Sequence, residues 1–156
     1  AAELLGFFRF SRAAVVADSY IGVFPGGAGG TLTHSSAEGG VLRDFGSCST
    51  GLFSRLGSEC EEQRLTVPRA LEAAMAGFPS VAFASINSKA DKGQIAAYRA
   101  IATEMLLPGS SLTGEDFFAM VNGVLRQHNR HENFVSYLVD GDRHGFLPYS
   151  VVYSVG

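Results

Sequence analysis

Short apolar runs alternate along this chain with longer segments of helical periodicity. The runs are rich in alanine, β-branched and aromatic residues and have the length of a strand. They cover residues 12–17, 81–86 and 134–139. The helical segments, in which apolar residues recur three and four positions apart, cover residues 66–77, 95–106 and 117–128. Strands separated by helices predict a parallel sheet with right-handed crossovers and helices on both faces, and therefore an α/β fold.

The ends of these helices carry recognisable signals. Pro68 falls in the first turn of the first helix, and Gly77 ends it. Residues 108–109, Pro-Gly, end the second helix. Thr113 and Asp116 have the spacing of a capping box, with aspartate in place of glutamate. These signals support the division into strands and helices.

The chain is expected to form one domain over residues 1–156. With 156 residues, of which 46% are hydrophobic, it can build one core but not two. Three strands make a thin sheet for this architecture, so the chain is expected to be part of a larger α/β fold. Residues 2–10 are apolar with a helical bias and are expected to end a helix that begins upstream.

Charge and hydropathy argue against two classes of partner. Twelve basic and 15 acidic residues give a net charge of −3, and the Lys and Arg residues are scattered, so no nucleic-acid partner is expected. No stretch approaches ~18 consecutive apolar residues, so no transmembrane span is expected. The first residues also do not resemble a signal peptide, because the third residue is acidic where the start of a signal peptide would be basic.

Residues 24–62 have the composition of a long loop and are expected to form a lid-like insertion. Their glycine-rich stretch, PGGAGG, has neither the GK[ST] ending nor the G-x-G-x-x-G spacing of a phosphate-binding loop. Cys48 and Cys60 lack a second cysteine pair and a histidine at zinc spacing, so no metal site is expected. We favour a disulfide over two free thiols, because the loop has few other features that would order it. On the entropic model, closing this loop would stabilise the folded chain by about 3 kcal/mol. A disulfide implies an oxidising compartment, secreted or lumenal.

Polar residues follow each of the three predicted strands. Asp18 and Ser19 follow the first strand, Asp91 comes after the second, and His144 after the third. The carboxyl ends of parallel strands form the edge where α/β sheets place their chemistry. An aspartate followed later by a histidine matches the order of the last two members of an α/β-hydrolase triad. In such a triad the imidazole takes the serine proton, and the carboxylate orients the imidazole.

Other interpretations of these polar residues remain open. Asp91 has the position of a helix N-cap. Asp140 and Asp142 are expected to fix the turn before His144, and either could replace Asp91 as its partner. Asp18 is expected to support a loop next to the nucleophile, and Ser19 to cap a turn.

The remaining histidines suggest no chemistry. His128, His131 and Glu132 lack the order of the metal-binding helix motifs, and cations at a helix C-terminus are favoured by the helix dipole. His34 lies in a glycine- and serine-rich loop without an interpretable pattern.

Three segments of the chain resemble the pectin acetylesterase and Notum-like carboxylesterases, a family with the α/β-hydrolase fold. They are VVADSYIGVF at 15–24, FASINSKADKGQIAAY at 83–98 and NFVSYLVDGDRHGFLP at 133–148. In that family the triad aspartate precedes a Gln-Ile helix start, here Gln94 and Ile95, and the triad histidine lies in a Gly-x-x-His loop, here 141–144. The resemblance implies that Asp91 is the orienting carboxylate and His144 the general base.

The chain departs from the family at the nucleophile. The family's serine lies in a Gly-x-Ser-Ala-Gly-Gly elbow before the Asp-Ser strand, and this chain begins after that point. Ser49, in GSCSTG, lacks the first elbow glycine and a preceding apolar strand, so it is not expected to be the nucleophile. An upstream segment or another chain would then supply the serine and complete the sheet.

The expected function is that of a serine carboxylesterase without a cofactor. Its substrates would be O-acyl esters, acetyl or fatty acyl, of a polysaccharide or a protein. The alternative is a non-catalytic, hydrolase-derived subunit that acts as a structural or docking module in a larger assembly. A nucleotide-binding domain is disfavoured, because the chain has no phosphate loop.

Overall fold

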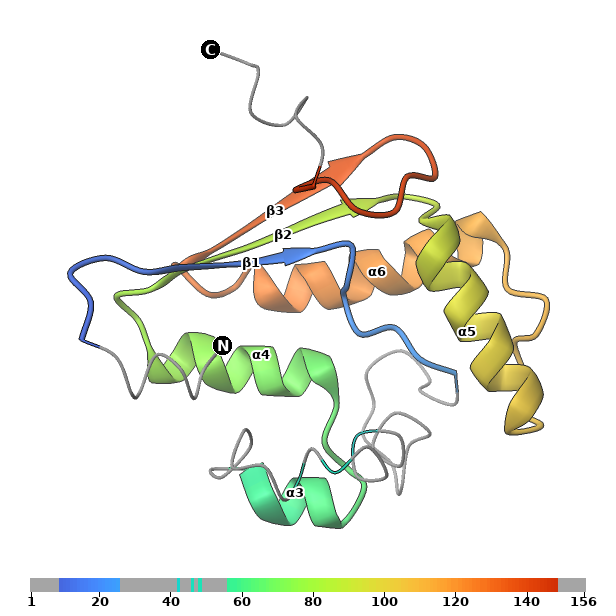
Figure 1. The fold of residues 1–156 in the computed structure, drawn as a ribbon, viewed down its shortest axis with the longest axis horizontal. Helices are drawn as coiled ribbons and strands as arrows, with labels where there is room; N and C mark the ends of the chain where they lie inside the picture. The colour runs from blue at the N-terminus through green and yellow to red at the C-terminus, as the bar shows by residue number, and fades with distance from the viewer. Residues whose placement is uncertain (1–8, 26–41, 43–45, 47, 49–55, 149–156) are drawn as a thin grey trace.

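A computed structural model describes residues 9–25, 42, 46, 48 and 56–148 of the protein. Three parallel strands form one sheet in the order β1-β2-β3 (Figure 1). The strands are β1 (Ala14–Asp18), β2 (Ala82–Ser88) and β3 (Phe134–Val139). The helices are α3 (Gly57–Glu61), α4 (Val67–Gly77), α5 (Lys92–Glu104) and α6 (Gly114–His128). The predicted α/β content and parallel pairing are confirmed.

The third strand has the predicted bounds, and the first two extend further toward their carboxyl ends than predicted. In β2, Asn87 and Ser88 pair with Leu138 and Val139 of β3. Backbone groups form this ladder whatever the side chains are, so polar residues that suggested a loop remain in the strand.

One face of the sheet is packed against the helices. Val15, Phe83, Phe134 and Leu138 point to this face and join two clusters of apolar side chains. One cluster includes Met75 of α4 and the strand residues Val15 and Phe83. The other is built from α5, α6 and the chain after β1, with Ile21, Ile95, Tyr98, Leu112, Phe117, Val121 and Leu125 as its buried members.

The opposite face of the sheet is open in the part of the chain that the structure describes. Val16, Val135 and Val139 are exposed there, and Tyr137 is 57% exposed. Figure 1 shows all four described helices on the same side of the sheet. The prediction of helices on both faces is therefore wrong for these residues. Both crossovers step in the same direction along the sheet, and crossovers of one hand that step in one direction place their helices on one face.

The predicted start signals of α4 and α6 are confirmed, whereas α5 begins at Lys92, three residues before its predicted start. The Thr66 side chain caps α4 by accepting a hydrogen bond from the Arg69 amide. Thr113 and Asp116 form the reciprocal bonds of a capping box at the start of α6. Each cap satisfies backbone amides that the first turn of a helix leaves without a partner.

The second helix ends two residues before its predicted end. Leu106 takes a left-handed φ of 53° and is 92% exposed, so it lies outside the core. The amide of Leu107 then bonds to the carbonyl of Ala102, which closes the helix end. Apolar periodicity extended the predicted helix to residue 106, because it does not register that the backbone leaves the helix after Glu104.

The expected lid is described only in part. Its last residues form the short helix α3, which the glycine-rich composition did not predict. Cys60 of α3 is buried and bonded to Cys48, with sulfurs 2.11 Å apart, so the predicted disulfide is confirmed. Residues 26–41, His34 among them, and Ser49 lie outside the described residues, as do residues 1–8 of the expected N-terminal helix. Phe10 is described and is not helical.

His128 is a core residue rather than an exposed cation at a helix end. Its ring is fully buried, meets the ring of Phe134 edge to face at 5.3 Å, and places Nε2 3.3 Å from the carbonyl oxygen of Pro68. Burial lowers the pKa of His128, although the Pro68 carbonyl and Glu72 act in the opposite direction. The ring is therefore neutral in the folded protein near neutral pH.

We expect His128 to make folding sensitive to mild acid. In the unfolded chain a histidine takes up a proton near pH 6.5, whereas the folded chain resists protonation, so the free energy of unfolding falls as the pH drops below about 6.5. His128→Gln should make this fall shallower when urea unfolding is measured at several pH values between about 7.5 and 5.

His131→Gln is the matched control, because His131 is only partly buried. Because the charge of His131 makes only the smallest contribution to the lowered pKa of His128, that variant should change the slope far less than His128→Gln does. A wild-type slope in His128→Gln would contradict the explanation.

Candidate active site

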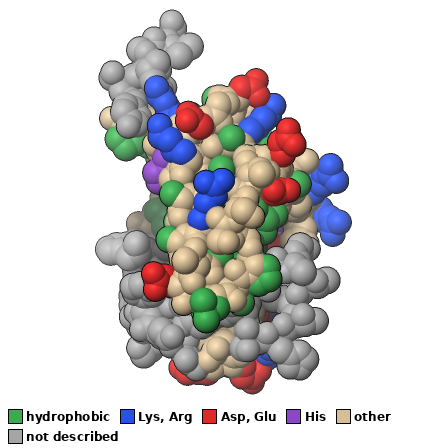
Figure 2. All heavy atoms as spheres, turned by 90° about the vertical axis from the view of Figure 1, so that its right-hand side faces the viewer, with side chains coloured by type: hydrophobic (Ala, Val, Ile, Leu, Met, Phe, Trp, Pro, Cys, Tyr) green, Lys and Arg blue, Asp and Glu red, His purple; other side chains and the backbone are tan. Residues whose placement is uncertain are grey.

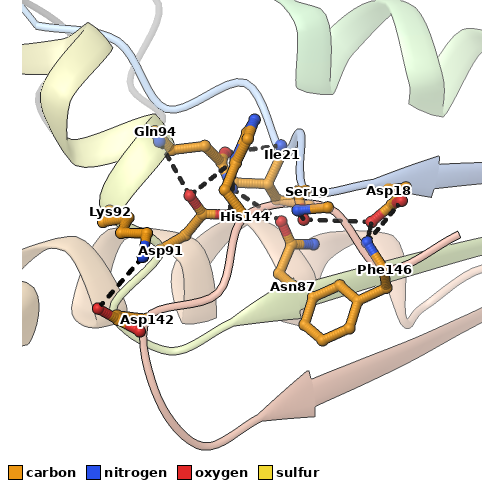
Figure 3. Close-up of polar contacts among 11 residues, drawn as sticks. Asp18, Ser19, Ile21, Asn87, Asp91, Lys92, Gln94, Asp142, His144 and Phe146 are labelled. Atoms are coloured by element: carbon orange, nitrogen blue, oxygen red, sulfur yellow. Dashed lines mark hydrogen bonds and ion pairs between the residues drawn. The ribbon is translucent and has the colours of Figure 1, made fainter. Parts of the chain in front are cut away.

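The carboxyl ends of the three strands bring together the polar residues singled out from the sequence. Asp18 and Ser19 leave β1, Asp91 follows β2 by three residues, and His144 lies in the loop after β3. Figure 3 shows these residues along one rim of the sheet. The rim is the edge at which parallel sheets carry their functional groups.

Asp91 and His144 are in direct contact, as expected. The Nδ1 atom of His144 lies 2.9 Å from Oδ1 and 3.1 Å from Oδ2 of Asp91. The Asp91 side chain is fully buried, whereas that of His144 is 51% exposed. Because an ionised carboxylate only accepts hydrogen bonds, Nδ1 carries the proton that faces it. In the neutral ring, Nε2 on the far side then has a free lone pair, which is the state a general base requires.

Asp91 also caps the helix that follows it. Its Oδ1 accepts a hydrogen bond from the backbone amide of Gln94 at 2.9 Å, which is the N-cap bond of α5. The two interpretations of Asp91 are therefore compatible: one carboxylate caps α5 and binds the imidazole.

Gln94 holds the Asp91 carboxylate from the buried side. Its Nε2 donates to Oδ2 of Asp91 at 3.1 Å and to Oδ1 of Asn87 at 3.0 Å. Its Oε1 accepts the Ile21 amide at 3.1 Å, and Asn87 donates in turn to Ser85. The carboxylate thus accepts two hydrogen bonds from Gln94 and keeps one side open to His144. Its orientation is therefore fixed independently of the imidazole.

The other two acidic residues near the histidine loop point elsewhere. Asp140 lies 2.6 Å from the Lys89 ammonium, which lowers the pKa of that carboxyl group through a hydrogen bond and charge attraction. Asp142 lies 4.0 Å from the Lys92 ammonium. Both pairs are largely exposed, and the carboxylate that meets His144 is that of Asp91.

Asp18 and Ser19 bind the backbone of the loop that carries His144. The Ser19 hydroxyl accepts a hydrogen bond from the Gly145 amide at 2.7 Å, and Asp18 accepts bonds from the amides of Phe146 and Leu147. Ser19 is 1% exposed, so an ester cannot reach its hydroxyl. These residues are therefore structural parts of the rim, with a wider role than the turn cap expected for Ser19.

The His144 ring lies directly over Gly93 in the first turn of α5. A Cβ atom added at Gly93 would lie 2.5 Å from Cγ and 2.7 Å from Nδ1 of the ring. Atoms this close cannot coexist, so the ring needs glycine at this position.

Sequence reasoning missed the roles of Gln94, Asn87 and Gly93. Asp91 and Gln94 have the three-residue spacing of a capping box, which was a usable signal. Asn87 is a polar residue that alternates with Phe83 and Ser85 on the packed face of β2, and a longer predicted strand would have marked it as buried. Nothing local pointed to Gly93, because the side chain it accommodates lies 51 positions away.

The described residues contain neither a cluster of metal ligands nor a membrane-spanning helix. In the part of the chain that is described, no three His, Cys, Asp or Glu side chains gather closely enough to hold a metal ion. Among the described helices, none has the length and apolar character needed to cross a membrane. Figure 2 shows Lys and Arg mixed with Asp and Glu over the face that carries α5.

Comparison with known proteins gives no relative. No protein-family model, curated protein or solved structure matches the chain. The chemistry of the strand-end rim and the sequence resemblance are therefore the two grounds on which a function can be inferred.

We expect Gly93→Ala to displace the His144 ring while leaving α5 intact. The new methyl group would occupy the space of the imidazole, so the hydrogen bond from Nδ1 to Asp91 should be lost. The ¹⁵N chemical shifts of the His144 ring should then change from the pattern of a ring protonated at Nδ1 to that of a free histidine.

Gly123→Ala in α6 is the matched control, because a Cβ atom there meets nothing within 4 Å. Alanine should raise the free energy of unfolding by about 0.5–1 kcal/mol at Gly123, without altering the His144 signals. Unchanged His144 signals in Gly93→Ala would show that the ring does not sit over Gly93 in solution.

Proposed function

We propose that this chain carries the orienting carboxylate and the general base of a serine carboxylic ester hydrolase. The observation that carries the proposal is the contact between a buried carboxylate, Asp91, and a half-exposed imidazole, His144, at the carboxyl rim of a parallel sheet. The proposal also rests on the resemblance to the pectin acetylesterase and Notum-like carboxylesterases. A segment outside this chain would supply the serine and the oxyanion donors.

In this mechanism His144 accepts and gives up a proton in each of two half-reactions. Its Nε2 removes the proton of the serine hydroxyl while the serine oxygen bonds to the ester carbonyl carbon. The imidazolium then gives the proton to the leaving alcohol as the ester bond breaks, which leaves an acyl-serine. Water repeats both steps, and its attack releases the acid and the free serine. Asp91 stabilises the positive charge on the ring during each transfer.

The proposed substrates are O-acyl esters, acetyl or fatty acyl, on a polysaccharide or a protein. This part of the proposal comes from the resemblance alone. The disulfide between Cys48 and Cys60 favours a secreted or lumenal location, because such bonds persist in oxidising compartments.

We expect loss of either group to slow hydrolysis by several orders of magnitude. Fluorophosphonate labelling and hydrolysis of a p-nitrophenyl ester should slow by about 10⁴-fold in Asp91→Asn and by about 10⁶-fold in His144→Ala. The measurement uses the native protein or complex that contains this chain.

Asp142→Asn and His131→Ala are matched controls, since they make the same chemical changes away from the rim contact. Both should label at the wild-type rate. A native protein that the probe does not label, or an Asp91→Asn variant that labels at full rate, would rule out the proposal.

A second candidate function is a structural or docking module without catalysis. The observation that favours it is the open sheet face, where Val16, Val135 and Tyr137 remain exposed. Apolar area of this kind is covered in most folded proteins by another part of the chain or by a partner. The labelling experiment separates the two candidates, because only the hydrolase reacts with the probe.

A further inference from the structure

We propose that Asp18 and Ser19 are positioning residues for His144. They hold the backbone of its loop at the end of β1 and so determine where Nε2 lies relative to the nucleophile. This inference rests on the proposed hydrolase function and adds to it two residues that touch neither the substrate nor the imidazole.

Three consecutive amides directly after His144 bind to these two side chains. Gly145 donates to Oγ of Ser19 at 2.7 Å. Phe146 donates to both carboxylate oxygens of Asp18, at 3.0 and 2.9 Å, and Leu147 donates to Oδ2 at 2.8 Å. The loop backbone is thus fastened at its first three residues beyond the histidine. Figure 3 shows the bond from Phe146 to Asp18.

The two side chains form one rigid unit with the sheet. Asp18 is the last residue of β1 and pairs with Ile86 of β2. The Ser19 amide donates to the Ile86 carbonyl at 2.8 Å, and its hydroxyl donates to Oδ1 of Asp18 at 3.1 Å. Ser19 is buried and takes a left-handed φ of 56°, a conformation that is uncommon for serine and that its neighbours must therefore impose.

His144 needs such an anchor because its own burial does not hold it. Half of its side chain is exposed, and Gly93 packs against the ring on one side. The hydrogen bond to Asp91 fixes one ring atom, Nδ1, but leaves the ring free to pivot about that bond. The hydrogen bonds to the backbone of residues 145–147 supply a second fixed position beside Nδ1. Together the two fixed positions determine the direction in which Nε2 points.

The expected consequence is a loss of rate without a loss of binding. A displacement of about 1 Å at a reacting group can cost roughly 10²-fold in rate. Asp18→Asn keeps the size of the side chain but replaces one accepting oxygen with the NH₂ of an amide, which only donates. Asparagine therefore cannot accept all of the hydrogen bonds that Asp18 accepts. It should lower the rate of ester hydrolysis per active site by about 10²-fold, with little change in KM.

The experiment measures two quantities in the native protein. Active sites are first counted by fluorophosphonate titration, because a purely structural defect lowers their number and leaves the rate of each one unchanged. Amide hydrogen exchange is then followed at Gly145, Phe146 and Leu147. These amides should exchange at least about 10²-fold more slowly than in an unstructured chain, and Asp18→Asn should remove most of that protection.

Two further variants complete the design. Ser19→Gly removes the hydroxyl, and glycine takes the left-handed conformation at no steric cost, so this variant tests the anchor even where Asp18→Asn does not fold. Like Asp18→Asn, Ser19→Gly should lower the rate of ester hydrolysis per active site and speed amide exchange at residues 145–147. Asp142→Asn, in the same loop but with only a 4.0 Å contact to the Lys92 ammonium, should change neither quantity.

Two results would overturn the inference while leaving the proposed function standing. One is exchange at the rate of an unstructured chain at all three amides of the wild-type protein. The other is faster exchange in Asp18→Asn with an unchanged rate per active site. Absence of fluorophosphonate labelling in the wild-type protein would instead overturn the proposed function, and the inference with it.

Discussion

The burial of the Asp91 carboxylate is the constraint on which the strand-end rim depends. A charge removed from water is costly unless hydrogen bonds replace its hydration. Gln94 supplies two donors, one from its backbone and one from its side chain, and His144 supplies the third. Gln94 in turn binds Asn87 and Ile21, so the carboxylate is tied to β2 and to the chain that leaves β1. The position of the carboxylate therefore depends on α5, on β2 and on the chain that leaves β1.

The same rim is built from backbone as much as from side chains. Asp18 and Ser19 bind amides of the histidine loop, while the amides of Ala90 and Lys92 bind carbonyl groups of Gly141 and Asp142. The loop after β3 is therefore fastened on both sides, to the end of β1 and to the start of α5. This double attachment explains how a half-exposed histidine can hold a defined place without being buried.

Two histidines of this chain illustrate opposite uses of one side chain. His128 is enclosed by the core, where burial lowers its pKa and keeps the ring neutral. His144 lies at the surface with one nitrogen directed at a buried carboxylate. The first is a packing residue, and the second has the contacts that the proposed mechanism asks of its base. The position of His128 at the end of an amphipathic helix suggested an exposed cation, because the helix pattern does not reveal what packs against its last turn.

The sequence alone predicted the alternation of strands and helices, the capping box of α6, the disulfide, and the meeting of His144 with an aspartate at the strand-end rim. These follow from local rules: apolar periodicity, capping chemistry, cysteine count, and the meeting of parallel strand ends at one edge. The family resemblance pointed to Asp91, while Asp140 and Asp142 remained open as partners. Only the tertiary structure decided that the described helices all lie on one face of the sheet, that Gly93 makes room for the His144 ring, and that Asp18 and Ser19 bind the loop beyond it. Each of these depends on contacts between residues far apart in the chain, and such contacts leave no periodic or local mark in the sequence.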